Sequence, residues 1–251
     1  MIPLLRLFAT AVTFLTRLPL ARWSYAEPER LAQASVFFPL VGAVVAAIAA
    51  GAAWLSLQLL PPALAPWCAL ATAIAVTGGF HEDGLADTAD GLGGGFSRER
   101  KLEIMRDSRI GSYAGLALIV VLGGKYLALA QLSPANLFLA LGLGHVLARW
   151  SVLPLAALLP YAREGAAANK PVADGIGARQ VIAATLLSAA LVAAAGWLAV
   201  LAALVSLIVV ALAGLYFRRQ LGGITGDTLG AANQFVELAC YLAVAGAQRW
   251  T

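Results

Sequence analysis

Long apolar runs recur along the chain, each close to the length of a membrane-spanning helix. Such a helix needs roughly 20 predominantly apolar residues. Runs of this kind lie at approximately 35–59, 64–80, 113–132, 136–159, 181–196, 198–217 and 235–248. The stretch from Val181 to Phe217 is too long for one crossing and divides near Gly196 into a tight helical hairpin. The last run is short and also fits a re-entrant or partly interfacial segment, so the pattern predicts six or seven spans.

The N-terminal segment, residues 1–20, is apolar but interrupted. Arg6, Thr10, Thr13 and Arg17 recur at helical spacing and form one polar stripe. A helix with one apolar and one polar face lies in the membrane interface, whereas a signal peptide has an uninterrupted apolar centre. We therefore predict an N-terminal interfacial helix that stays attached to the protein.

The composition agrees with a membrane protein. Hydrophobic residues make up 61% of the chain and charged residues 12%, whereas a soluble domain carries about a quarter charged residues. Backbone amides in a bilayer are satisfied within each spanning helix. Cys68 and Cys240 lie in separate apolar runs, which is not the spacing of a disulfide framework or a metal knuckle. We predict an all-α, polytopic helical membrane protein with a single domain over residues 1–251.

Basic residues occur in alternate connections. They lie in the N-terminal segment and in the connections 81–112, 160–180 and 218–234, whereas the turns around Pro61 and Ser133 have none. Short loops rich in Lys and Arg stay in the cytoplasm, so the polar connections are predicted to share the cytoplasmic face. This bias explains the net charge of +4. The sequence has no basic run with interleaved aromatics, so a nucleic acid partner is not indicated.

Acidic residues are concentrated in one connection. Seven of the thirteen lie between Glu82 and Asp107. On a helix, Asp83, Asp87 and Asp90 would project from one face and repel one another unless a cation lay between them. Oxygen ligands suit Mg²⁺ or Mn²⁺, which bridge carboxylates to substrate phosphates. The spacing predicts a divalent-cation site, with a solvated helix end as the alternative.

Glycines and arginines follow these acids. Gly91 and the run Gly93–Gly95 predict a flexible turn, which is equally compatible with backbone N–H groups that approach an anion and with a simple linker between helices. Arg106 and Arg109, packed around Asp107, are candidates for binding substrate phosphate, because guanidinium groups match phosphate oxygens. Positive-inside anchoring is sufficient for three other basic residues of the segment, Arg98, Arg100 and Lys101.

Two cations lie inside predicted spans, where a charge marks a functional site by default. Lys125 and Arg149 are candidates for holding a phosphate or pairing with the aspartates, and snorkelling to the interface is the alternative. His81 is the only histidine near the carboxylates and is equally compatible with a general base or a structural partner. Asp90 is an alternative base. His145, in an apolar span, is expected to be an interior residue.

A second polar segment, Gly222–Gly230, opens the last predicted helix. Asp227 is a candidate metal ligand, and Thr225, Asn233 and Glu237 are candidate substrate ligands. For Asp227, Asn233 and Glu237, capping or packing is the alternative. A third, weaker patch on the same side is Tyr161–Gly165.

Several segments carry a resemblance to one known family. They are Thr13–Pro19, Phe38–Gly42, Gly79–Leu92, Ile104–Gly111, Lys125, Arg149–Trp150, Tyr161–Arg163 and Thr225–Asp227. The long acidic motif followed by Arg-Asp-Ser-Arg is the most specific of them. Over nearly its whole length the chain resembles the cobalamin synthase family, the adenosylcobinamide-GDP ribazoletransferases. Glu82 and Gln234 depart from the pattern expected at their positions.

The resemblance implies a transferase in the last steps of vitamin B12 biosynthesis. In this reaction α-ribazole or its 5′-phosphate attacks the cobinamide-side phosphorus of adenosylcobinamide-GDP, giving adenosylcobalamin or its phosphate and GMP. Phosphoryl displacement needs positioning and charge neutralisation. Mg²⁺ on Asp83, Asp87 and Asp90, with Arg106 and Arg109 on the diphosphate, would supply both.

This assignment places the protein in the cytoplasmic (inner) membrane of a bacterium or archaeon, with its site facing the cytoplasm. The lipid bilayer and the two substrates are the expected partners, and a homo-oligomer or contact with other corrinoid-assembly enzymes stays open. The rival functions are a CDP-alcohol-type phosphotransferase that makes a phospholipid and a transporter. The CDP-alcohol signature is not matched, and a transporter would place acids deep in the bilayer.

Overall fold

The computed structural model describes residues 3–27, 29–163 and 175–248, and throughout these ranges the regular structure is helical. The helices in chain order are α1 (Pro3–Leu15), α2 (Glu29–Ala34), α3 (Phe38–Leu59), α4 (Ala65–Thr77), α5 (Phe80–Gly94), α6 (Arg98–Ile104), α7 (Ser112–Ala130), α8 (Pro134–Leu158), α9 (Ala178–Val192), α10 (Trp197–Leu221) and α11 (Gly226–Ala247). In the described part of the chain the only β-type pairing outside the helices is an isolated parallel bridge between Tyr161 and Ile224. The all-α prediction is confirmed.

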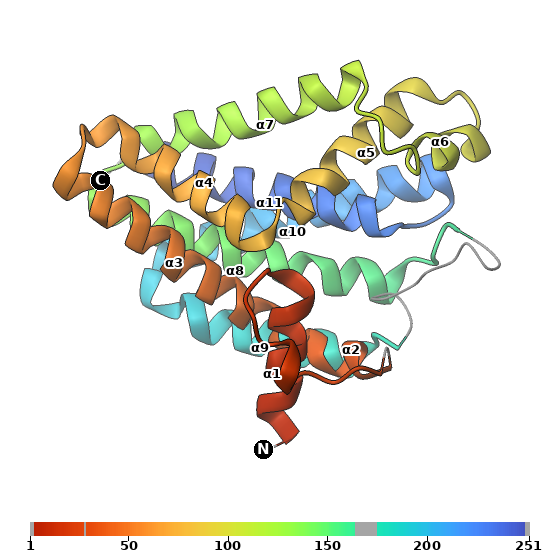
Figure 1. Cartoon of the computed structure of the whole chain (residues 1–251), viewed down its shortest axis with the longest axis horizontal. Coiled ribbons are helices and arrows are strands. Elements are labelled where there is room, and N and C mark those ends of the chain that lie inside the picture. The colour runs from red at the N-terminus through yellow and green to blue at the C-terminus, as the bar shows by residue number, and fades with distance from the viewer. Residues whose placement is uncertain (1–2, 28, 164–174, 249–251) are drawn as a thin grey trace.

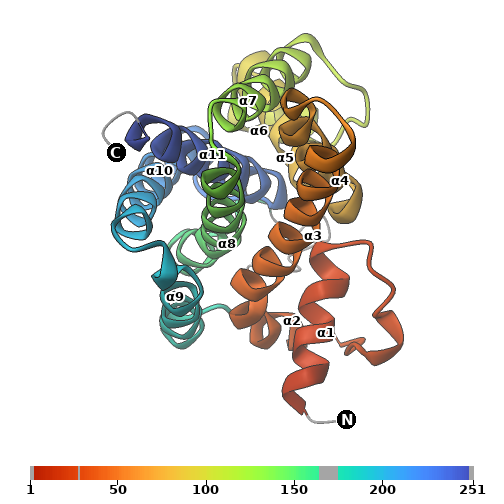
Figure 2. The same cartoon turned by 90° about the vertical axis from the view of Figure 1, so that its left-hand side faces the viewer.

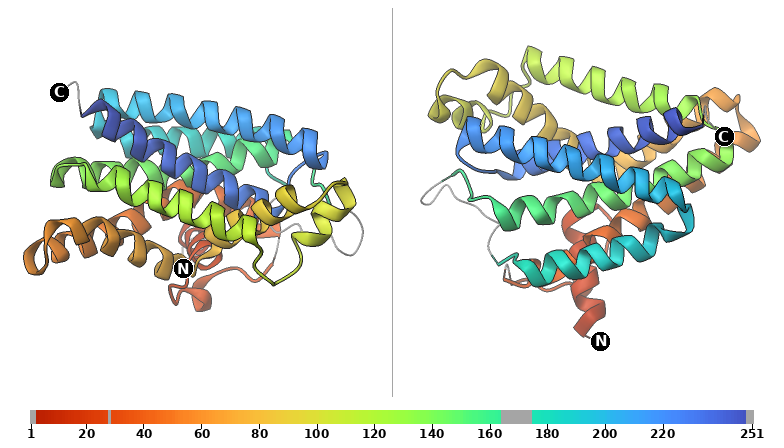
Figure 3. Two further views of the ribbon diagram at one scale, coloured as in Figure 1. Left: turned by 90° about the horizontal axis from the view of Figure 1, so that it is seen from above. Right: turned by 180° about the vertical axis from the view of Figure 1, so that it is seen from behind.

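Helix α8 lies at the centre of the bundle. It packs most extensively against α3 on one side and α11 on the other, and Figure 1 shows these helices running side by side. Seen from above, α7, α10 and α11 run alongside one another (Figure 3). Most of α8 is buried, because it packs between α3 and α11 and also against α9 and α10.

Five segments are long and apolar enough to cross a membrane: residues 30–59, α7, α8, residues 178–195 and α10. A sixth would be the pair α4 and α5, counted together as one broken span. The structure therefore supports five or six spans. Helix α11, which contains the predicted seventh run, begins at Gly226 and does not qualify by composition, because it carries buried Asn233, Gln234 and Glu237.

The predicted run 64–80 does not form a straight span. Helix α4 ends at Thr77, and the two following glycines, Gly78 and Gly79, have φ angles of 68° and 71°. Left-handed backbone of this kind ends helices and favours glycine. Helix α5 then leaves at 89° to α4. The bend turns the acidic helix along the bundle.

The predicted division at Gly196 is confirmed, but α9 packs mainly against α8 and α3 rather than against α10, so the two helices do not form a tight hairpin. A short 3-10 turn, Ala193–Ala195, ends at Gly196, whose φ angle is 58°. Helix α10 follows directly.

Helix α1 is steeply inclined to the bundle in Figures 1 and 2. Part of its polar stripe is satisfied within the protein. The hydroxyl of Thr10 accepts a hydrogen bond from the backbone N–H of Tyr25 at 2.9 Å, and the Arg6 guanidinium lies 4.1 Å from the centre of the Tyr25 ring. Its placement in the membrane interface stays a prediction.

Candidate active site

Helices α5 and α11 cross at two glycines. A Cβ atom added to Gly84 would lie 2.8 Å from the carbonyl oxygen of Asp227 and 3.2 Å from Cα of Gly230. Backbone contact this close is open only to residues without a side chain. The crossing brings the acids of α5 beside the first turn of α11.

Three of the predicted acids meet at this crossing. Asp83 is exposed and Asp87 half-buried on α5, and Asp87 lies within electrostatic range of both Asp83 and Asp227. Asp227 is in the first turn of α11, where the positive end of the helix dipole favours an anion. Within residues 3–27, 29–163 and 175–248, no three or more His, Cys, Asp or Glu side chains are arranged as a metal site.

Asp90 has a different environment. Its Oδ2 accepts a hydrogen bond from the backbone N–H of Gly111 at 2.6 Å, and its Oδ1 accepts one from Ala114 at 2.9 Å. Because Gly111 precedes α7, Asp90 caps the start of that helix. The structure thus gives Asp90 a structural role, and its predicted roles as metal ligand and base stay predictions.

The expected glycine turn is shorter than predicted. Helix α5 continues to Gly94 and only Gly95 is extended. Gly91 and Gly93 are helical, and a Cβ atom there would collide with Met105 and Tyr113, respectively. These two glycines therefore serve packing rather than flexibility.

The residue that pairs with Asp227 is Arg163. Its Nη2 donates to Asp227 Oδ2 at 2.7 Å, and the same oxygen accepts a hydrogen bond from the Thr225 hydroxyl at 3.3 Å. Thr225 also caps α11 by accepting from the Thr228 N–H at 3.2 Å, and its role as a substrate ligand stays a prediction.

Arg163 is positioned by a backbone strap, residues 160–163, held against residues 221–224. The N–H of Ala162 donates to Ile224 O at 2.7 Å, and the N–H of Ile224 donates to Pro160 O at 2.9 Å. Arg98 links the two segments, because it donates hydrogen bonds to Ala162 O at 2.6 Å and to Leu221 O at 2.8 Å. Arg98 is therefore more than the membrane anchor that the sequence suggested.

The two predicted phosphate-binding arginines lie elsewhere. Arg106 is exposed, and exposed Arg109 pairs with Asp107, to which its Nε donates at 3.0 Å. The hydrogen bonds from Arg109 lower the pKa of Asp107 to about 2. Arg109 lines a separate hollow with Asp90. The structure thus brings neither arginine to Asp227, and their substrate role stays a prediction.

The intramembrane cations pair with a buried glutamate. Lys125 Nζ lies 2.9 Å from Oε1 of Glu237, and Arg149 Nη1 lies 3.2 Å from its Oε2. His145 Nδ1 is also 3.2 Å from Oε2. The partner of Lys125 and Arg149 is thus an acid on α11 rather than the aspartates of α5, and neither cation snorkels, because both are buried.

The same interior holds the remaining candidates. Gln234 accepts a hydrogen bond from Lys125 at 2.6 Å. Asn233 is fully buried, and its side-chain oxygen and nitrogen have no hydrogen-bond partner among the described residues. His81 is only 2% exposed and lies within electrostatic range of Arg149, Glu237 and Lys125. It therefore points away from the aspartates, as the helical spacing predicts.

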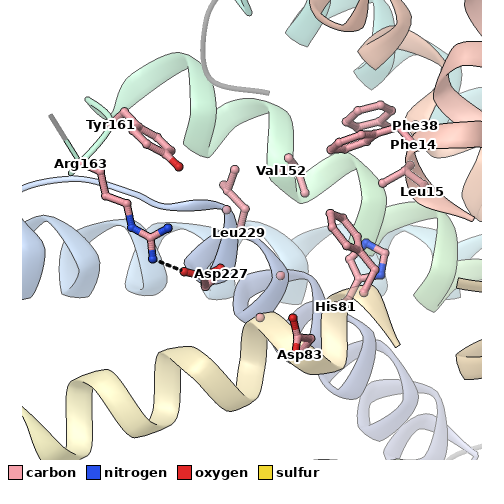
Figure 4. Close-up of a pocket in the computed structure, with 14 residues that line it drawn as sticks. Phe14, Leu15, Phe38, His81, Asp83, Val152, Tyr161, Arg163, Asp227 and Leu229 are labelled. Carbon is pink, nitrogen blue, oxygen red and sulfur yellow. Dashed lines mark hydrogen bonds and ion pairs between the residues drawn. The ribbon is translucent and has the colours of Figure 1, made fainter. Parts of the chain in front are cut away.

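A cavity of about 260 Å³ lies beside the crossing and is lined by residues of α1, α3, α5, α8, α11 and the strap. In Figure 4, Asp83 faces Asp227, with Arg163 beyond it, while Phe14 and Phe38 lie on the far side. The wall includes Asp83, Asp227 and Arg163, together with His81. The cavity thus joins a charged end to an apolar one.

The sequence missed Arg163 as a site residue. The patch around it was only the third and weakest signal, because its partner Asp227 is 64 positions away. Two local clues pointed to it: its place just after a predicted span, on the face of the other polar connections, and the segment Tyr161–Arg163 among those that carry the family resemblance.

Comparison with known proteins identifies the family. A family described as cobalamin-5-phosphate synthase matches residues 7–245. The chain belongs to this family.

Curated proteins similar to this chain are named as adenosylcobinamide-GDP ribazoletransferases. An adenosylcobinamide-GDP ribazoletransferase of Leptothrix cholodnii is 45% identical over 248 residues, covering 94% of each chain. One of Shewanella pealeana is 43% identical over 244 residues, covering 95% of this chain and 94% of its own. No solved structure matches the chain.

Proposed function

We propose that this protein transfers adenosylcobinamide phosphate from adenosylcobinamide-GDP to α-ribazole or its 5′-phosphate, giving adenosylcobalamin or its phosphate and GMP. The observation that carries the proposal is the meeting of Asp83, Asp87 and Asp227 with Arg163 beside a cavity, in a chain of this family. Charged groups of both signs at one cavity suit transfer of a phosphoryl group from a diphosphate to a hydroxyl group.

The donor set fits a divalent cation by its chemistry. Asp83, Asp87 and Asp227 offer oxygen ligands only, the kind that Mg²⁺ and Mn²⁺ prefer. Mg²⁺ keeps several waters and takes only one or two carboxylates besides substrate phosphates, so a complete protein cage is not required. When bound there, Mg²⁺ or Mn²⁺ would neutralise charge on the diphosphate.

The remaining steps belong to side chains of the protein. Arg163 offers two N–H groups in a plane, which match two oxygens of a phosphate. As the acceptor hydroxyl oxygen bonds to the cobinamide-side phosphorus, the bond from that phosphorus to the GMP oxygen breaks. The hydroxyl proton passes to one of the carboxylates at the crossing. The apolar wall of the cavity excludes water that would otherwise hydrolyse the donor.

We also propose that the site faces the cytoplasm of a bacterial inner membrane. The strap and the C-terminal end of α10 lie at the same end of the bundle as α6 in Figure 1. That end carries Arg98, Arg163, Arg218 and Arg219, and such basic connections stay in the cytoplasm.

The test is a reaction with purified components. Protein in detergent or liposomes is mixed with adenosylcobinamide-GDP, α-ribazole and Mg²⁺, and GMP and cobalamin are measured by chromatography. We expect the two products in equal amounts. Absence of both from a correctly folded protein would overturn the proposed function, and the result with CDP-alcohol donors would show whether the rival activity is present instead.

A further inference from the structure

The end of the cavity opposite the acids is aromatic. Phe14 of α1, Phe38 of α3 and Phe80 of α5 line it, together with the apolar side chains of Leu15 and Val152. Figure 4 places Phe14 and Phe38 away from Asp227 and Arg163. The cavity thus offers two different environments within the reach of one small molecule.

The three rings form a corner. Phe14 and Phe38 are stacked, with centroids 5.9 Å apart and ring planes at 11°. Phe80 meets Phe14 edge-on, with centroids 5.5 Å apart and planes at 77°. Aromatic rings bind one another in both of these arrangements, so a flat ring entering the cavity would find a face and an edge to pack against.

One polar group lies beside this corner. His81 lines the cavity and meets Phe80 edge-on at 5.3 Å between centroids. It is 2% exposed, and among the described residues its Nδ1 has no hydrogen-bond partner. A buried polar atom without a partner is unfavourable, so a ligand that offered one hydrogen bond here would be stabilised.

We propose that this aromatic subsite, formed by Phe14, Phe38, Phe80 and His81, binds the flat base of the acceptor nucleoside. The proposal rests on the proposed function. The benzimidazole of α-ribazole would pack in the corner with its one free ring nitrogen on His81, and its ribose would reach toward Asp83 and Asp227. His81 is then a specificity-determining residue rather than the general base.

The hydrogen-bonding capacity of the subsite favours this base over the guanine of the donor. Guanine carries several donors and acceptors on its edge, and burying them without partners is unfavourable. A benzimidazole needs a single partner, and His81 is the only polar side chain at this end of the described cavity. The volume of about 260 Å³ suits one nucleoside, and the far larger corrin ring would stay outside.

Direct binding of α-ribazole to the purified full-length protein, without donor, tests the subsite by calorimetry. We expect Phe14→Leu and Phe80→Leu to weaken this binding about tenfold, because each removes an aromatic contact. The KM for α-ribazole should rise accordingly, while the KM for adenosylcobinamide-GDP stays unchanged. Phe80 is 46% exposed, so its replacement leaves the fold least disturbed.

Phe8→Leu is the matched control. Phe8 lies on the same helix as Phe14 but packs against Phe37, with centroids 6.1 Å apart, and does not line the cavity. We expect it to bind α-ribazole as the wild type does. Unchanged α-ribazole binding in both cavity variants, or a loss confined to the donor, would overturn the proposal. Because binding is measured without turnover, this outcome is distinct from failure of the GMP-release assay.

Discussion

At the scale of single residues, Asp227 is the most heavily shared group of the site. One of its oxygens accepts from both Arg163 and Thr225, and Asp87 and Asp83 lie within electrostatic range. A cation and the Arg163 guanidinium would both be attracted to this carboxylate. A phosphate that arrives with the donor can draw the guanidinium toward itself, so Arg163 is the side chain best placed to bind it.

Arg163→Lys tests this assignment. Lysine keeps the charge but lacks the planar fork that binds two phosphate oxygens. We expect the KM for adenosylcobinamide-GDP to rise about tenfold, which corresponds to about 1.4 kcal/mol, with little change in the KM for α-ribazole. Steady-state kinetics measure both. Arg100→Lys is the control, because Arg100 forms an exposed ion pair with Glu103, and an equal loss in both variants would contradict the assignment.

At the scale of elements, the site depends on how closely α5 and α11 approach. Gly84 and Gly230 let the backbones touch, and this contact sets the separation of Asp87 from Asp227. The strap held by Arg98 adds Arg163 from a third direction. The site is therefore a product of helix packing rather than of one motif.

Gly84→Ala tests the close approach. The new methyl would lie 2.8 Å from the carbonyl oxygen of Asp227, and backbone must move to make room, at a cost of roughly 1–3 kcal/mol. We expect kcat to fall at least about tenfold, since small displacements of reacting groups are costly. The control is Gly51→Ala in α3, where the methyl would meet nothing within 4 Å. Wild-type kcat in Gly84→Ala would show that the approach is not needed.

Periodic features of the sequence predicted local structure well. The apolar runs indicated a helical membrane bundle, and Gly196 marked the break between α9 and α10. The spacing of the aspartates put Asp83 and Asp87 on one face, whereas Asp90 caps α7. Periodicity could not predict which side chains from distant segments pair with each other. The partner of Lys125 and Arg149 is Glu237, and that of Arg163 is Asp227. The bend at Gly78 also went unpredicted, because a glycine inside an apolar run is compatible with a continuous helix.

At the scale of the whole molecule, the arrangement of the spans decides which compartment the site faces. The strap, α6 and the end of α10 lie together at one end, and the turn between α3 and α4 lies at the opposite end (Figure 1). Each end contains an exposed position: Ser108, just after α6, and Ala63, in the turn between α3 and α4. Introduced cysteines at these positions would report the orientation.

We expect Ser108→Cys to be protected from a membrane-impermeant thiol reagent in intact cells and labelled after the inner membrane is opened. Ala63→Cys should be labelled as soon as the reagent reaches the periplasm. Both variants are made in a Cys68→Ser background, because Cys68 is partly exposed whereas Cys240 is buried. Labelling of Ser108→Cys in intact cells would place the site on the other face.

The central claim is that the acids at the crossing of α5 and α11 hold the divalent cation of the transfer reaction. Mn²⁺ binding to the purified protein, followed by the loss of the free-ion electron paramagnetic resonance signal, tests it most directly. We expect Asp87→Asn and Asp227→Asn to weaken Mn²⁺ binding at least about tenfold, since affinity follows the charge of the ligands, and to lose GMP release in parallel. Exposed Glu103→Gln should bind Mn²⁺ as the wild type does. Unchanged Mn²⁺ binding in both aspartate variants would contradict the account.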